Sequence, residues 1–281
     1  MKNILLPTDF SVNAHNAALY CLQLYRNTPS NFILLNSFDV NGYYHGNTFI
    51  ARPDLHTIQE REKNSERKLK ELKQEFEKIS EGHTFELISR NISLERAVNY
   101  EIYSRKIDVV IIGTQGETAA RNVAFGSNTI NLMENVINCP VLAVPSHVTY
   151  KGINEVVLPT GFKIGYDPVD LEYLISIVTS HHATVRVLHI EETGLDTVQE
   201  DNRSVLSKLL EDVAHSYHYL SFVSVPLGIY CFTESRGSDM IAFLNKKHSF
   251  FENLFFEPLY KKIGNFSQVP VLVMQTEKTV I

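Results

Sequence analysis

Three glycines follow an apolar run in the middle of the chain, and their spacing suits the binding of a phosphate group. The run Asp108-Val-Val-Ile-Ile112 is rich in β-branched residues, which is typical of a parallel strand covered on both faces. Gly113 and Gly116 follow it directly, and Gly126 comes after nine further residues. Because glycine has no Cβ, the backbone can turn sharply there and a ligand can approach it closely.

A helix is predicted to begin directly after the third glycine. Ser127 suits the N-cap of a helix that starts near Asn128, and Thr129 follows. The first turn of a helix has N–H groups without intrahelical partners, and the positive end of the helix dipole lies there. These groups would face the same space as the glycine turn. The sequence therefore predicts an anion site for a phosphate.

Strands and helices that alternate along the first half would position this turn. Apolar runs predict strands at 3–6, 32–35, 84–88, 108–112 and 141–144, helical spacing predicts helices at 12–25, 54–80, 94–104 and 128–137, and residues 40–53 are predicted to form an irregular loop. This order predicts an α/β fold with right-handed βαβ units and helices on both faces of a mostly parallel sheet. Ligands bind such sheets beyond the carboxyl ends of strands, where Gly113 lies together with Asp9 of Pro7-Thr8-Asp9.

Composition excludes several classes of protein. The chain has 281 residues, 44% of them apolar, and its net charge of -6 argues against a nucleic-acid binder. No apolar stretch is long enough to span a membrane and none resembles a signal peptide, so a cytoplasmic protein is expected. Cys21, Cys139 and Cys231 are widely spaced, which predicts buried thiols rather than disulfides or a zinc site.

The second half repeats the first in order. Residues 155–162 match 3–10, residues 185–190 match the second strand, residues 235–244 match 104–112, and residues 269–273 match 139–143. Four matches in the same order predict two domains of one fold at 1–147 and 152–281, joined near Ser146 to Gly152.

The repeat differs from the first half at the predicted site. Asp9, Gly113, Gly116, Gly126 and Ser127 align with Gly161, Leu244, Lys247, Glu257 and Pro258. Each replaced glycine adds a side chain, and Glu257 adds a negative charge where a phosphate would lie. The second copy is therefore predicted to keep the fold and lose the pocket. On this interpretation the glycines of the first copy serve a ligand and are not required by the architecture.

These motifs together resemble the universal stress protein family. They are Gly-x2-Gly-x9-Gly-Ser after the fourth strand, Pro-Thr-Asp after the first, and Cys-Pro-Val-Leu at the last. The resemblance implies two Rossmann-like five-stranded parallel sheets in the order 3-2-1-4-5, paired through their last strands as an intrachain pseudo-dimer. It also implies ATP, AMP or ADP as ligand, with Mg²⁺ accompanying ATP. The implied role is that of a stress sensor or regulator with at most slow hydrolysis; its protein partner stays unknown, and further association into homodimers is left open.

The resemblance also assigns roles to residues. Asp9 would hydrogen-bond the adenine edge, although capping of the following helix is an equal alternative for it. Ser37 would contribute backbone beside the base, and Ile112 and Gly113 would lie against the nucleoside. Ribose and phosphates would be held through backbone N–H groups and hydroxyls of Gly116, Gly126, Ser127, Asn128 and Thr129, with Pro7 and Thr8 completing the site.

Two other functions stay open. An adenylyl-transferring enzyme of the same superfamily is expected to carry His-x-Gly-His or Ser-Gly-Gly-x-Asp-Ser after the first strand, and Pro7-Thr8-Asp9-Phe10-Ser11 is neither. A nucleotide-free interaction scaffold is the second. No catalytic residue is predicted, and no Walker A lysine follows the glycines. His215 and His218 are three apart on a predicted helix, but they lack an acidic or cysteine partner and are not assigned to a metal.

Overall fold

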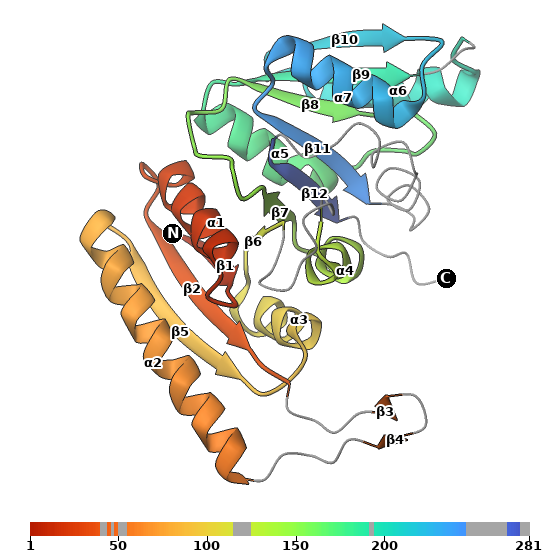
Figure 1. The fold of residues 1–281 in the computed structure, drawn as a ribbon. Coiled ribbons are helices and arrows are strands. Elements are labelled where there is room, and N and C mark those ends of the chain that lie inside the picture. Colours follow the sequence, from red (N-terminus) through yellow and green to blue (C-terminus); the bar gives the residue numbers. More distant parts are fainter. Residues whose placement is uncertain are drawn as a thin grey trace.

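A computed structural model describes residues 1–39, 44–45, 48–49, 55–114, 125–190, 194–245 and 269–275. In this part of the chain, a ten-stranded sheet runs through the whole molecule, with helices packed on both of its faces (Figure 1).

The sheet consists of two five-stranded halves. The strand order is β5-β2-β1-β6-β7 in the first half and β10-β9-β8-β11-β12 in the second. The strands are β1 Lys2–Pro7, β2 Ser30–Ser37, β5 Thr84–Arg90, β6 Val109–Gly113, β7 Val141–Val144, β8 Glu155–Pro159, β9 Thr184–Ile190, β10 His215–Leu220, β11 Met240–Asn245 and β12 Val271–Gln275. Neighbours within a half are parallel, whereas β7 and β12 pair antiparallel. Each half has the order 3-2-1-4-5, so the predicted pseudo-dimer of two Rossmann-like sheets is confirmed.

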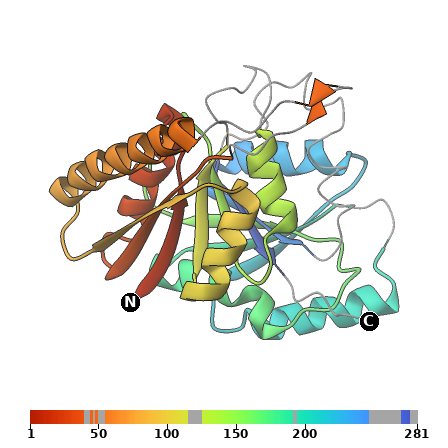
Figure 2. The ribbon, with the colours of Figure 1, turned by 90° about the horizontal axis from the view of Figure 1, so that it is seen from below.

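Helices cover both faces of this sheet (Figure 2). They are α1 Val12–Leu24, α2 Leu55–Ile79, α3 Leu94–Arg105, α4 Ser127–Asn135, α5 Pro168–Ser180, α6 Thr197–Leu209 and α7 Val225–Arg236. Buried residues of α1, α2, α5 and α6 join one core, and those of α3, α4 and α7 join the other. Alternate residues of each strand supply the two cores, since side chains alternate across a sheet. None of the described helices is long and apolar enough to cross a membrane.

Local contacts repeat between the halves as well. The Asn36 side chain at the end of β2 donates from Nδ2 to Thr8 O at 2.7 Å. In the second half, His189 Nδ1 lies 2.8 Å from Thr160 O at the matching position. A polar side chain of the second strand thus fixes the turn after the first strand in both copies.

Three predictions are corrected by the structure. The region predicted as an irregular loop contains two short strands, β3 Tyr44–His45 and β4 Thr48–Phe49, which pair antiparallel. His215 and His218 lie on β10 rather than on a helix, because the alternating tyrosines of His-Ser-Tyr-His-Tyr suit a strand. Cys231 is exposed on α7, whereas the other two cysteines are buried as predicted.

Candidate functional site

A cavity of about 90 Å³ opens at the carboxyl edge of the first half-sheet. Its lining comes from three strand ends and three helix starts: Pro7, Thr8 and Asp9 at β1, Ser37 at β2, Ile112 and Gly113 at β6, Ala14 of α1, Leu94 of α3, and Asn128 and Thr129 of α4. Eight of the eleven residues predicted for the site therefore line one cavity. Gly126 and Ser127 begin α4 beside it without lining it. Gly116 lies outside the described residues.

The turn after β1 is held by side chains of its own sequence. Thr8 Oγ1 accepts from the Phe10 N–H at 3.0 Å, and Asp9 Oδ1 accepts from the Ser11 N–H at 3.0 Å. Ser11 Oγ in turn accepts from the Ala14 N–H at 3.2 Å and is the N-cap of α1. Asp9 therefore does not cap the helix. It shapes the turn and keeps its carboxylate exposed at the cavity.

Gly113 has an architectural role that the repeat does not reveal. A Cβ on Gly113 would lie 2.8 Å from Asn13 O and 3.3 Å from Ala14 N, both backbone atoms in the first turn of α1. At the matching position the second half has Leu244. In the second half, residues 160–167 connect β8 to α5, and this connection is twice as long as the one between β1 and α1. In addition, α5 approaches β11 at few positions, whereas α1 packs closely on β6. The interpretation that Gly113 serves a ligand alone is therefore wrong.

The N-terminus of α4 faces this edge of the sheet. Its N-cap is Gly126 and not Ser127, so the helix begins one residue earlier than predicted. The Gly126 N–H donates to Thr114 O at 2.7 Å, which ties the helix start to the end of β6. The Ile130 N–H makes the first intrahelical bond, to Gly126 O at 3.0 Å. The N–H groups of residues 127–129 precede that bond and supply the positive end of the helix dipole.

The hydroxyls of two predicted site residues, Thr129 and Ser37, donate to backbone carbonyls of the protein. Thr129 is 2% exposed, and its Oγ1 donates to Gly113 O at 2.8 Å. Ser37 Oγ donates to Ile92 O. These bonds fix α4 on β6 and β2 on the segment before α3. Any ligand contact from Thr129 would thus come from its backbone N–H.

Three residues of this site were not predicted from the sequence. Ala14 and Leu94 line the cavity from the first turns of α1 and α3, and Asn36 holds the Thr8 carbonyl. Ala14 and Leu94 follow the serine N-caps Ser11 and Ser93, and a helix that begins after a strand of a parallel sheet starts at the carboxyl edge. That signal was present in the sequence, but it did not say which side chains point inward.

The described lining offers binding groups rather than a catalytic pair. Asp9 is its only ionisable residue, and the other side chains contribute apolar surface, amide or hydroxyl groups. No group of three His, Cys, Asp or Glu residues placed to hold a metal occurs among the residues described. A nucleophile with an adjacent base is not formed by these lining residues.

The corresponding edge of the second half is held by bulky side chains. Phe162 is fully buried and stacks on His189 with ring centroids 5.1 Å apart. Gln199 Nε2 donates to Gly161 O at 2.8 Å, and Asn202 Nδ2 donates to Phe162 O at 2.8 Å. Lys247, Glu257 and Pro258, which align with the other site positions, lie outside the described residues.

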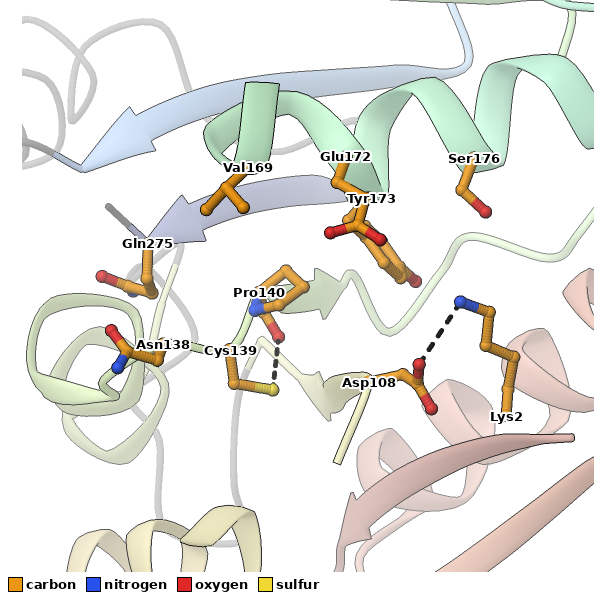
Figure 3. A pocket seen from close by; sticks show the side chains of 10 residues that line it. All are labelled: Lys2, Asp108, Asn138, Cys139, Pro140, Val169, Glu172, Tyr173, Ser176 and Gln275. Atoms are coloured by element: carbon orange, nitrogen blue, oxygen red, sulfur yellow. Dashed lines mark hydrogen bonds and ion pairs between the residues drawn. The ribbon is translucent and has the colours of Figure 1, made fainter. Parts of the chain in front are cut away.

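A second cavity, of about 310 Å³, lies between the halves at the opposite edge of the first half-sheet (Figure 3). It is lined by Lys2, Asp108, Asn138, Cys139, Pro140, Val169, Glu172, Tyr173, Ser176 and Gln275. Lys2 Nζ is 3.3 Å from Asp108 Oδ1, so these charges pair with each other. Burial raises the pKa of the Cys139 thiol, which keeps it protonated. None of the residues predicted for the site lies here.

Comparisons with known proteins agree with this architecture. The model of the universal stress protein family matches residues 1–145. A universal stress protein from Archaeoglobus fulgidus DSM 4304 has a similar structure, with a TM-score of 0.68 and 17% identity over 98% of this chain and 97% of that one. A putative universal stress protein from Pseudomonas aeruginosa UCBPP-PA14 gives a TM-score of 0.58 and 12% identity over 98% and 93%. A search of curated proteins gave no match.

Proposed function

Because the chain belongs to the universal stress protein family, we propose that its first half binds ATP or another adenine nucleotide in the cavity at the ends of β1, β2 and β6. The observation that carries the proposal is the meeting of the Asp9 turn, the end of β6 and the N-terminus of α4 at one cavity. Adenine offers an exocyclic amine as donor, and the phosphates are anions. A carboxylate at one side and a helix N-terminus at the other complement the two ends of such a ligand.

The volume of the cavity suggests which part of the nucleotide would lie inside it. About 90 Å³ is less than a whole nucleotide needs, so only part of the base would enter the cavity and the rest of the ligand would lie at its mouth. The base would then lie among Ile112, Leu94 and Ser37, with its amine toward Asp9. Ribose and phosphates would extend toward the N–H groups of residues 127–129, where Mg²⁺ would accompany ATP.

The proposed role is that of a cytoplasmic sensor or regulator in a stress response. The described lining supplies no base to activate water, so bound ATP would be hydrolysed slowly at most. The second half would act as a partner domain rather than as a second nucleotide site. Turnover would instead favour an adenylyl-transferring enzyme, and the absence of any nucleotide affinity would favour a scaffold.

The test combines released nucleotide with a site variant. Purified protein is denatured and the supernatant analysed for adenine nucleotides, and ATP is then titrated into ligand-free protein. Gly126→Glu places a carboxylate at the N-cap of α4 and is expected to weaken ATP binding by about tenfold or more, because like charges repel. Gly194→Glu is the matched control, since it adds the same charge where no atom lies within 4 Å of a new Cβ. Equal affinity of the two variants would contradict the proposed site.

A further inference from the structure

The C-terminal end of α4 is held by two amide side chains from the second half. Asn245, the last residue of β11, donates from Nδ2 to Met133 O at 3.2 Å and to Glu134 O at 3.4 Å. Gln275, the last residue of β12, donates from Nε2 to Met133 O at 2.8 Å. The two amides also bond each other, with Asn245 Nδ2 3.0 Å from Gln275 Oε1. Figure 3 shows the Gln275 side chain on the Asn138 side of the cavity, away from Lys2.

These bonds bring hydrogen-bond donors from outside α4 to carbonyl groups of its last turn. The last carbonyls of a helix have no intrahelical donor, and α4 has no basic residue in its last turn. Its nine residues are too few for a helix that is stable without tertiary contacts. Donors from β11 and β12 therefore contribute directly to where this helix lies and how firmly it is held.

The other end of the same helix reaches the candidate nucleotide site. Asn128 and Thr129 line the cavity, and Thr129 is bonded to Gly113 of β6. Nine residues at the α-helical rise span about 14 Å, which links the cavity to the second half through one short rigid element. Leu132 and Met133 are both 1% exposed, so the helix is packed between its two ends.

The topology explains why the second half can reach this helix. Asn245 follows Leu244, the residue that aligns with Gly113. Because β7 and β12 are antiparallel, the carboxyl ends of β11 and β12 meet the amino end of β7, where α4 terminates (Figure 1). The end of β6 borders the cavity in the first half, whereas the end of its counterpart β11 contacts α4 from the second half.

We propose that Asn245 and Gln275 are positioning residues that set the nucleotide affinity of the first half by holding α4. The inference rests on the proposed function and gives the second half a task within it. Loss of either amide donor loosens α4, and binding must then also order the helix, which lowers the affinity. The second half thereby regulates a site that it does not itself line.

The test uses near-isosteric substitutions in the full chain. Gln275→Glu and Asn245→Asp keep the shape but remove the donors and bring a negative charge to the negative end of the helix dipole. Asn202→Asp is the matched control, because Asn202 is an amide donor to a backbone carbonyl of the same half that does not contact α4. Gln275→Lys is the rescue variant, since an ammonium still donates to the helix end and suits the dipole.

Two readouts separate positioning from general stability: ATP titration and amide hydrogen exchange across α4. We expect Gln275→Glu and Asn245→Asp to weaken ATP binding about five- to tenfold and to speed exchange in α4, as loss of one or two hydrogen bonds predicts. Asn202→Asp and Gln275→Lys are expected to bind ATP as the wild type does. Unchanged affinity in the two acidic variants, or an equal loss in Asn202→Asp, would overturn the inference. If the wild type binds no ATP, the proposed function fails, and exchange in α4 alone still decides whether these amides hold the helix.

Discussion

Replacing Gly113 by alanine tests the packing of α1 on β6. The new methyl group would lie 2.8 Å from Asn13 O and 3.0 Å from Asn13 C. Both are main-chain atoms of a helix turn, so no flexible side chain can move aside, and α1 itself must shift. Overpacking of this kind costs about 1–3 kcal/mol. A loss of about 2 kcal/mol corresponds to a melting temperature roughly 4–8 °C lower for a domain of this size.

The assay is thermal and urea unfolding followed by far-ultraviolet circular dichroism, because the chain contains no tryptophan. Gly161→Ala is the control for a glycine at a strand end. Its new Cβ would be 3.7 Å or more from the nearest atoms, which belong to the flexible Lys163 side chain. We expect that variant to match the wild type or to gain up to about 1 kcal/mol. A Gly113→Ala protein as stable as Gly161→Ala would contradict the close packing of α1 on β6 at Gly113.

Three further predictions concern polar contacts between separate elements. Thr129→Val removes the hydroxyl that donates to a strand carbonyl and should lower the stability by about 1–2 kcal/mol in urea unfolding. Hydrogen bonds from Arg236 and Arg186 lower the pKa of Glu155 to about 2. Glu155→Gln should therefore lower the free energy of unfolding by about 2 kcal/mol at neutral pH. The hydroxyl oxygens of Tyr25, at the C-cap of α1, and Tyr173, on α5, are 2.5 Å apart. Each Tyr→Phe change should therefore lower the free energy of unfolding by about 1 kcal/mol, and the double variant should lose less than the sum of the two.

Each of these has an outcome that would contradict it. Ser127→Ala, an exposed position on the same helix, should leave stability unchanged, so an equal loss would sink the Thr129 prediction. The folded pKa of Glu155 lies below its ordinary value of 4.5, so the unfolded chain takes up the proton first as the pH falls. The melting-temperature gap between wild type and Glu155→Gln should thus shrink from about pH 5 downward, and a constant gap would argue against it. Strictly additive tyrosine variants would show that the two hydroxyls are not coupled.

The fold could be predicted because each half carries its own strong local signals. Val109 to Ile112 and Val141 to Val144 are fully buried strands, and their continuous apolar runs are visible in the sequence without any partner. The ordered repeat then made two similar sheets the simplest arrangement. The site residues that follow strands were predicted for the same reason, since a parallel sheet brings all carboxyl ends to one edge.

What could not be predicted depends on contacts between distant elements. The closeness of Gly113 to Asn13 follows from how α1 lies on β6, and the comparison with Leu244 pointed the wrong way because the second half has a longer connection. Asn245 and Gln275 are 112 and 142 residues from Met133, whose carbonyl they bind. No local pattern marks an amide side chain as the cap of a helix in the other half. The bond of the Thr129 hydroxyl was missed because a hydroxyl suits a ligand and a carbonyl equally well.

The most direct test of a single nucleotide site in the first half is calorimetric titration of ATP into the ligand-free full-length protein. We expect one nucleotide bound per chain, with binding weakened in Gly126→Glu and retained in Gly194→Glu. Two nucleotides per chain would show that the second half also binds, and no measurable binding would contradict the proposed function.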